Sequence, residues 1–356
     1  MLRINSDMAR KPEGELRRGW TTGACATAAT KAALDALWGE GFPKDVQITL
    51  PKGEMPIFEL AQTEQGDGWA YVGITKDAGD DPDVTHGALI VAKVQESTGG
   101  IQFKAGIGVG EVTKPGLPLA VGEPAINPKP REMMVGVIKE QAAKYGKAPN
   151  VIIEVSIPGG DEIAKKTWNG RLGIVGGLSI LGTTGVVRPF SCSAWIASIH
   201  RGIDVAAAEK APHVAGCTGA TSEAVVQKLY NLPDHAMLDM GDFAGGMLKY
   251  LAKKPIPRLT IGGGIGKMTK LAQGARDLHS SRSQVDFELL STWAKECGLA
   301  DISNANTALE ALEIAGEGLA KTVAERAKAQ AGSMLAGTAV DIIIINREGA
   351  IVGRSQ

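Results

Sequence analysis

Four short apolar segments in the second half of the sequence are each followed by a turn rich in glycine. The four pairs are residues 178–181 with 182–185, 213–216 with 217–219, 236–239 with 241–243, and 258–261 with 262–267. Strands and helices therefore alternate along this part of the chain, which is typical of a mostly parallel α/β sheet. In open sheets of this kind, ligands bind beyond the carboxyl ends of the strands. The pattern predicts a small-ligand site built from these turns.

The first half of the sequence predicts mixed α and β structure. Strands are predicted at 46–50, 69–74, 88–94 and 101–103, and helices from Gly23 through Trp38 and at 131–145. We therefore predict an α/β fold with α+β character, in two domains: an N-terminal α+β domain, residues 1–148, and a C-terminal, mostly parallel α/β domain, residues 149–356. Within the second domain we predict a strand at 151–157, one long helix at 306–330 and a last strand at 340–346.

Composition excludes several classes of protein. The 38 basic and 39 acidic residues nearly cancel, and aromatic residues make up only 4% of the chain, which argues against a nucleic-acid partner. The four cysteines form no CxxC pair, and the five histidines show no metal-ligand spacing, so we expect no metal site in the protein and a reducing, cytoplasmic location. Because no run of about 18 apolar residues occurs, we expect no membrane span. A homo-oligomer is compatible with the sequence, which does not determine the oligomeric state.

The glycine turns match neither common phosphate-binding motif. In GGGIGK, Lys267 is followed by Met268, so the P-loop pattern fails, and the GxGxxG spacing of dinucleotide sites is also missing. An adenosyl ligand without phosphates needs a glycine turn, an apolar slot and an acidic residue for the ribose hydroxyls. The cofactor-binding residues predicted for such a ligand are Gly182, Thr183, Thr184, Gly185, Gly216, Thr218, Gly219, Asp239, Gly241 and Asp242. The alternative is that the two aspartates are solvated turn residues.

A basic segment follows the last glycine turn, from Lys267 to Arg282. Cationic side chains at the rim of a pocket suit a substrate with several carboxylates, and an N-capped helix beside two arginines is a natural anion site. The substrate-binding residues predicted on these grounds are Arg17, Arg18, Thr21, Thr22, Lys267, Lys270, Ser280 and Arg282. The alternatives are an ordinary capped helix and a solvated helix face. His279 is the candidate catalytic acid or base, against the alternative of a structural or capping histidine.

An acidic loop, Asp77–Asp83, lies between two predicted strands. Its sequence DAGDDPD lacks the DxDxDG spacing of calcium loops. We therefore expect its carboxylates to be held by main-chain turns and to bind no metal ion.

Several long stretches resemble the cobalt-precorrin-5B C1-methyltransferases of cobalamin biosynthesis, in the same order. They are RRGWTTGACATAATKAA, KDAGDDPDVTHGALI, GIGVGEVTKPGLPLAVGEPAINPKPREMM, GGLSILGTTGVVRPFS, GDFAGGMLKYL and KMTKLAQGARDLHSSRSQVD, which together span roughly residues 17–290. One departure is that residues 262–266 are richer in glycine than the family pattern, which leaves the use of that loop open.

The resemblance implies transfer of a methyl group from S-adenosylmethionine to ring carbon C1 of a cobalt-bearing, ring-contracted tetrapyrrole, in the anaerobic-type route. Cobalt then arrives as part of the substrate. The peripheral carboxylates of such a substrate would meet the basic segment and the helix start near Arg17 and Arg18. Two rival functions are a nucleotide-dependent oxidoreductase or kinase, and a non-catalytic tetrapyrrole carrier.

Overall fold

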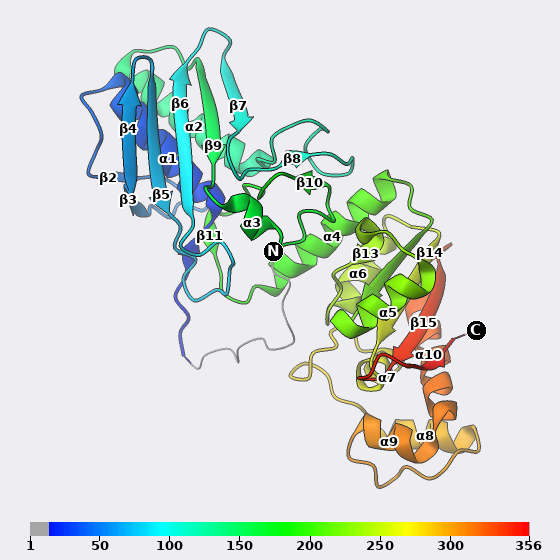
Figure 1. Ribbon diagram of the computed structural model, residues 1–356. Coiled ribbons are helices and arrows are strands. Elements are labelled where there is room, and N and C mark those ends of the chain that lie inside the picture. Colours follow the sequence, from blue (N-terminus) through cyan, green and yellow to red (C-terminus); the bar gives the residue numbers. More distant parts are fainter. Residues whose placement is uncertain (1–13, 356) are drawn as a thin grey trace. The chain divides into compact units, whose positions relative to one another are not determined.

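The structure, a computed structural model, describes residues 14–355 and contains two compact units that divide between Ser191 and Cys192 (Figure 1). The boundary predicted after residue 148 falls inside the first unit. The reason is that the strand expected to begin the second domain, β9 (Val151–Ser156), pairs with strands of the first unit on both sides. No helix within residues 14–355 is long and apolar enough to cross a membrane.

The first unit is built on a five-stranded sheet with the strand order β4-β5-β6-β9-β7. Its other strands are β4 (Gln62–Gly66), β5 (Trp69–Thr75), β6 (Leu89–Glu96) and β7 (Ile101–Ala105). Neighbouring strands are antiparallel except β7 and β9, which are parallel. Alternate apolar residues of β5, β6 and β9 are buried on one face, as the period of two residues in a strand requires. That face is covered by helices α1 (Thr22–Trp38) and α2 (Pro128–Tyr145) (Figure 1).

Helix α1 explains the run of small residues near the start of the sequence. The side chain of Thr21 caps the helix by accepting a hydrogen bond from Ala24 N at 3.2 Å. Its alanines and Cys25 are buried on almost every side, because the helix lies against both α2 and the sheet. Small side chains let these elements approach closely, so the Ala-rich stretch serves packing.

Three two-stranded ribbons complete the first unit, and two of them join segments far apart in the sequence. The pairs are β1 (Gly19–Trp20) with β11 (Val186–Val187), β2 (Asp45–Gln47) with β3 (Ile57–Glu59), and β8 (Glu111–Val112) with β10 (Ile174–Val175); the short helix α3 spans Gly160–Ala164. The first ribbon brings the end of the unit back to the start of α1.

The second unit is a five-stranded sheet with the order β13-β12-β14-β15-β16. Its strands are β12 (His213–Cys217), β13 (Met237–Leu238), β14 (Arg258–Gly263), β15 (Ala339–Ile345) and β16 (Ile351–Arg354). The first four are parallel and β16 is antiparallel, which confirms the mostly parallel sheet that the sequence predicted. The chain passes from β12 to β13 on one side, and then to β14 on the other side of β12. This reversal is the topological switch point of a doubly wound sheet.

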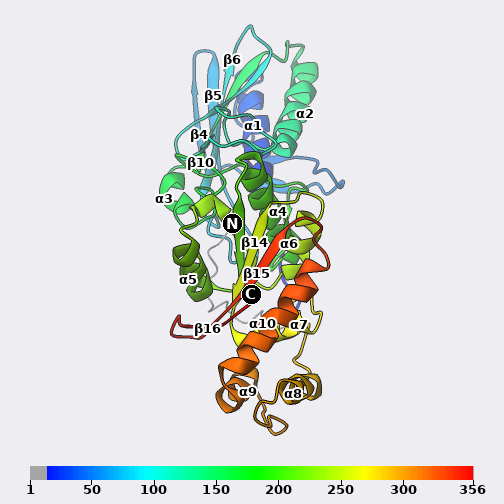
Figure 2. The ribbon, with the colours of Figure 1, turned by 90° about the vertical axis from the view of Figure 1, so that its right-hand side faces the viewer.

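Helices cover both faces of the second sheet. They are α4 (Cys192–Ala208), α5 (Ala220–Tyr230), α6 (Ala244–Leu251), α7 (Ile265–Ala272), α8 (Phe287–Glu296), α9 (Ala308–Ala315) and α10 (Glu317–Gly332), with a 3-10 turn, η1, at Asp234–Ala236. Helix α5 packs on one face, and α4, α6, α7 and α10 contribute to the core on the other (Figure 2).

The single long helix predicted at 306–330 is instead two helices, α9 and α10. Gly316 ends α9 and begins α10, with a φ of +69°. A residue with positive φ cannot continue a right-handed helix, and glycine adopts that conformation without steric cost. The apolar periodicity on both sides of Gly316 concealed this break.

Candidate functional site

The carboxyl edge of the second sheet holds the candidate site. Strands β12 and β14 end side by side at the switch point, and helices α5 and α7 begin there after Gly219 and Gly264. The two strand ends are tied together, since Thr218 N donates to Gly262 O at 2.9 Å. Ligands of doubly wound sheets bind at this position, where the chain reverses direction and helix N-termini carry unpaired N–H groups.

Two glycines of the β14 turn are required by close approach. A Cβ atom on Gly263 would lie 2.6 Å from Thr218 Oγ1, and one on Gly262 would lie 2.9 Å from Cys217 Sγ. Gly219 is different, because a Cβ atom there would meet nothing within 4 Å. The glycines therefore bring the turns after β12 and β14 together and leave the space above Gly219 open. This assigns a packing role to two of the four glycines in the loop whose glycine content exceeds the family pattern, since Cβ atoms on Gly264 and Gly266 would meet nothing closer than 3.8 Å.

The turn after β13 adds two carboxylates to this edge. Asp239 follows the strand directly, and Gly241 N donates to Cys217 O at 3.1 Å, which holds the turn against the end of β12. Lys267 Nζ lies 2.7 Å from Asp242 Oδ1 and 3.4 Å from Thr218 O. That carboxylate oxygen is buried and makes no hydrogen bond among the described residues, so the ion pair is what compensates its charge.

Lys267 therefore bridges two turns at the edge of the sheet, with 38% of its side chain exposed. The sequence predicted it as a rim contact for substrate, and the structure shows in addition that it pairs with a carboxylate of the protein. Its ammonium group pairs with Asp242, whereas Asp239 directly follows β13, the position at which doubly wound sheets place an acid for ribose hydroxyls.

An aromatic wall at this edge was missed by the sequence analysis. Trp195 Nε1 on α4 donates to Asp239 O at 2.7 Å, and its ring lies 5.8 Å from the ring of Phe243, centroid to centroid. A Cβ atom on Gly241, whose φ is +52°, would stand 3.1 Å from the Trp195 ring. Trp195 belongs to the helix that precedes the sheet, and no sequence pattern links it to a turn 44 residues away.

The part of the basic segment that follows α7 is folded back onto the turn after β13. Leu278 N donates to Asp242 O at 2.8 Å, and Gly245 N donates to Arg276 O at 2.7 Å. Lys270 is only 8% exposed, and its Nζ donates to Leu278 O at 3.2 Å. The prediction that Lys270 contacts substrate at a solvent rim is therefore wrong. It holds the loop that follows its own helix.

The end of this segment is exposed and directly follows the part bonded to Asp242. His279, Ser280 and Arg282 are all exposed. His279 Nδ1 lies 2.8 Å from Ser281 Oγ and accepts a hydrogen bond from Ser281 N at 3.2 Å. The imidazole thus caps its own turn through Nδ1, which leaves Nε2 as the nitrogen that could act on a bound molecule.

The turn at Gly182–Gly185 lies in the first unit and is not part of the second sheet. It closes over the N-terminus of α1: Thr22 Oγ1 donates to Leu181 O at 3.1 Å, and Thr21 N donates to Gly185 O at 3.0 Å. A Cβ atom on Gly182 would lie 2.2 Å from Thr21 Oγ1. The grouping of Gly182, Thr183, Thr184 and Gly185 with the strand ends of the second sheet is therefore corrected.

The N-terminus of α1 is largely occupied by the chain itself. Gly23 N donates to Leu181 O at 3.1 Å, and Thr21 takes the N–H of Ala24. Arg17 forms a two-pronged ion pair with Asp77, and Arg18 NH1 lies 3.3 Å from Glu54 Oε1. Thr21, Thr22 and Gly23 N therefore have partners within the chain, whereas Arg17 and Arg18, each with 57% of its side chain exposed, keep further N–H donors. Of the anion site predicted at Arg17, Arg18, Thr21 and Thr22, the two arginines remain a prediction.

The carboxylates of the acidic loop are held partly by main-chain N–H groups, as predicted, and partly by two cationic side chains, Arg17 and Lys76, which the prediction missed. Asp83 Oδ2 lies 2.6 Å from Nζ of the buried Lys76, and its other oxygen accepts from Thr85 N at 2.8 Å. Asp81 accepts from Phe190 N at 2.8 Å. Arg17 lowers the pKa of Asp77 to about 2 by hydrogen bonding, against the opposing effect of burial. Within residues 14–355, no group of three His, Cys, Asp or Glu side chains is arranged to hold a metal ion.

Comparison with known proteins identifies the family. The family model CbiD matches residues 9–189, and the model for the CbiD C-terminal domain matches residues 277–356. The chain belongs to the CbiD family. The first family model ends close to the division between the two compact units, and the strands of the switch point, β12 to β14, lie between the two matched regions.

Curated relatives of this CbiD-family chain carry one name over nearly their whole length. A protein of Brucella anthropi is 59% identical over 96% of this chain and 96% of its own, and one of Paramagnetospirillum magneticum is 57% identical over 96% and 98%. Both are named cobalt-precorrin-5B C(1)-methyltransferase. A crystal structure of the cobalamin biosynthesis protein cbiD from Archaeoglobus fulgidus matches with 29% identity and a TM-score of 0.42, covering 76% of this chain and 84% of that one.

A histidine at the opposite, amino end of β12 makes the stability of the chain depend on pH. Burial, with a smaller contribution from Arg258, lowers the pKa of His213 from 6.5 to about 4; Asp341 opposes the shift. The unfolded chain takes up a proton near pH 6.5, whereas folded His213 stays neutral, so stability is fully present above 6.5 and falls toward pH 4. Because His213 is only partly buried, solvent screens the effect and we expect a loss of about 1–2 kcal/mol.

The measurement is the melting temperature between pH 7 and pH 4 for the wild-type chain and the His213→Gln variant, which can still hydrogen-bond Thr260. We expect a shallower fall in the variant than in the wild type. His279→Gln, at an exposed position, should keep the wild-type slope. Identical slopes in the wild type and His213→Gln would show that His213 does not contribute.

Proposed function

We propose that this chain transfers a methyl group from S-adenosylmethionine to ring carbon C1 of cobalt-precorrin-5B, in cobalamin biosynthesis in the cytoplasm. The observation that carries the proposal is the shared name of relatives 57–59% identical over nearly the full length. Cobalt is then part of the substrate.

We propose that the methyl donor binds at the carboxyl edge of the second sheet. The residues present fit an adenosyl ligand: Asp239 would accept hydrogen bonds from ribose hydroxyls, and Trp195 with Phe243 would border the adenine. The N-termini of α5 and α7 offer N–H groups to the donor's carboxylate, with open space above Gly219. When bound, the donor supplies an electrophilic methyl group; the new carbon–carbon bond forms as its carbon–sulfur bond breaks.

Substrate contacts are proposed for the exposed end of the basic segment. His279, Ser280 and Arg282 directly follow the stretch that is hydrogen-bonded to Asp242, so they border the proposed donor site. Arg282 would bind a peripheral carboxylate, and Nε2 of His279 could take up a proton released from the ring. Lys270 positions the loop that carries these residues by bonding to Leu278 O, and Lys267 holds the neighbouring turn through its ion pair with Asp242.

The experiment that tests the function combines calorimetry with an assay of turnover. We expect the chain to bind S-adenosylmethionine and S-adenosylhomocysteine but neither NAD nor ATP, and to methylate cobalt-precorrin-5B. Binding of NAD or ATP alone would favour an oxidoreductase or kinase. Binding of the corrinoid without any adenosyl ligand would favour a carrier.

Two substitutions separate binding from chemistry. Arg282→Ala should weaken corrinoid binding about tenfold or more, because a charge-assisted contact is worth about 1.5–3 kcal/mol, and should leave donor affinity unchanged.

His279→Ala should lower turnover while both ligands still bind. Lys249→Ala, an exposed lysine on α6, is the matched control. Wild-type binding and turnover in both variants would remove this segment from the site.

A further inference from the structure

A groove of about 910 Å³ lies at the edge of the second sheet, where α10 runs beside β15 and β16. Its lining extends from Arg258 and Ala339, which begin β14 and β15, along β16 to Ile351, which pairs with Ile345 at the end of β15. The proposed donor site lies at the ends of β12, β13 and β14. None of the residues proposed for that site lines the groove, so the groove is a separate site on the same sheet.

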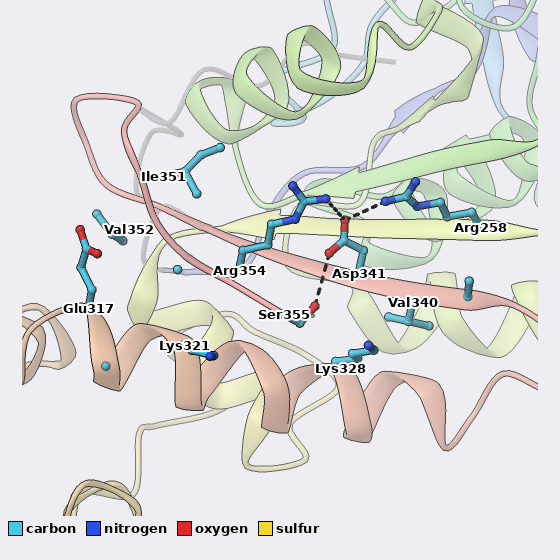
Figure 3. A pocket seen from close by; sticks show the side chains of 13 residues that line it. Arg258, Glu317, Lys321, Lys328, Val340, Asp341, Ile351, Val352, Arg354 and Ser355 are labelled. Atoms are coloured by element: carbon cyan, nitrogen blue, oxygen red, sulfur yellow. Dashed lines mark hydrogen bonds and ion pairs between the residues drawn. The ribbon is translucent and has the colours of Figure 1, made fainter. Parts of the chain in front are cut away.

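The strand side of the groove is organised around one buried carboxylate. Asp341, 7% exposed, faces Arg258 NH2 at 3.2 Å and Arg354 NH2 at 3.5 Å, and it accepts from Ser355 Oγ at 3.3 Å and from the hydroxyl of Tyr230 (Figure 3). Both guanidinium groups also lie over the Tyr230 ring, at 4.8 and 5.6 Å from its centroid. These contacts fix the two arginines in place before any ligand binds.

Both arginines nevertheless keep N–H donors that these contacts do not use. A guanidinium carries five N–H donors, and the bonds to Asp341 are made through NH2 in both residues. Their side chains are 40% and 48% exposed. Each arginine can therefore donate to a second oxyanion while it keeps Asp341.

The helix side of the groove adds two lysines. Lys321 and Lys328 both rise from α10 and are seven residues, about two turns, apart, which puts them on one face of the helix (Figure 3). Among the described residues that line the groove there are four cations, Arg258, Lys321, Lys328 and Arg354, and two carboxylates, Glu317 and Asp341. The lining thus carries an excess of positive charge on two opposing sides.

A hydroxyl without a partner lies next to the lysine side. Thr338 is 8% exposed, and its Oγ1 makes no hydrogen bond within residues 14–355. It lines a second hollow of about 500 Å³ that shares Lys328, Ala339 and Val340 with the groove. A buried hydroxyl normally finds a partner, so this one points to a polar ligand atom.

We propose that the groove binds a small molecule with two or more anionic groups, phosphate or carboxylate. A single charge cannot meet arginines on the strands and lysines on α10 together, whereas a polyanion can bridge them. Arginine forks suit planar or tetrahedral oxyanions, and the volume is that of an ordinary small-molecule site. This site is independent of the methyl transfer proposed for the other edge of the sheet.

The test is calorimetry on the full chain with sodium tripolyphosphate and with citrate, in the absence of methyl donor and corrinoid. We expect saturable binding of at least one probe. Lys321→Ala and Lys328→Ala should each weaken it about tenfold. Lys249→Ala, which changes a lysine outside the groove, should bind as the wild type does. The lysine variants leave the Asp341 cluster intact, so they are expected to fold.

The two probes distinguish the sources of the anion. Tripolyphosphate alone would assign the groove to phosphate compounds, citrate alone to polycarboxylates, and binding of both to either class; each result supports the proposal. Absence of saturable binding by both probes would overturn it, as would an affinity equal in the wild type and both groove variants. Because no donor or corrinoid is present, either result leaves the proposed methyl transfer untouched.

Discussion

Asp239→Asn is expected to weaken the binding of S-adenosylmethionine by about ten- to a hundredfold, the equivalent of one lost charge-assisted hydrogen bond. The carboxylate directly follows β13, the strand next to β12, and comes about 20 residues after Gly219, the spacing at which doubly wound sheets place an acid for the ribose. Asparagine has nearly the same shape. The bond from Trp195 Nε1 is made to the main-chain oxygen of Asp239, so the substitution leaves it in place.

The measurement is titration calorimetry with S-adenosylmethionine and with S-adenosylhomocysteine. Because both ligands carry the ribose, both should lose affinity to the same extent. Glu313→Gln, on the exposed side of α9, is the control for removal of one negative charge from the same unit. An unchanged dissociation constant in a folded Asp239→Asn variant would place the ribose elsewhere.

Lys76→Ala is expected to destabilise the first unit by about 3 kcal/mol. Lys76 is buried, with its side chain 1% exposed, and its ammonium lies 2.6 Å from Asp83 Oδ2. Removing one partner of a buried ion pair costs about 3–5 kcal/mol. We expect a value at the lower end of this range because Asp83, with 26% of its side chain exposed, can be hydrated when Lys76 is removed. Burial acts to raise the pKa of Asp83. The charge of Lys76 and the hydrogen bonds from Lys76 and Thr85 outweigh this effect, so the pKa of Asp83 is lowered. Without Lys76 that pKa should rise.

Differential scanning calorimetry can measure this loss, which corresponds to roughly 6–12 °C for a unit of this size. The transition of the first unit should move and that of the second should not. Lys52→Ala, an exposed lysine of the first unit, provides the control and should shift the transition by less than about 1 °C. A small shift in Lys76→Ala would mean that the Asp77–Asp83 loop is held by its main-chain turns alone.

The elements of the fold were largely predictable because they depend on local periodicity. The alternating residues of β5 and the Thr-capped, Ala-rich start of α1 each carry their signal within a few residues. The boundary between the units was not predictable in the same way. Strand β9 is a strongly apolar strand that the sequence placed in the second domain, yet it pairs with β6 and β7 of the first unit, and only long-range pairing decides which sheet a strand joins.

In the candidate site, too, the residues marked by local sequence could be predicted, and the contacts between distant residues could not. Asp239, Gly241 and Asp242 could be chosen from sequence because a turn directly after a strand end marks the carboxyl edge. Lys267 and Lys270 were assigned to substrate because charge in a sequence says nothing about its partner; in the structure one pairs with Asp242 and the other bonds to Leu278 O. Trp195 could not be found, because its contact joins two elements far apart in the chain.

The sequence by itself determined the family, the alternation of strands and glycine turns, and the polar groups that end those strands. These properties depend on short stretches of chain, in which neighbouring residues constrain one another through backbone geometry. Only the tertiary structure decided which groups remain available to a ligand. The start of α1 is filled by Leu181, and Asp341 gathers two arginines at the far end of the sheet. Burial and pairing depend on residues that meet only after the chain has folded.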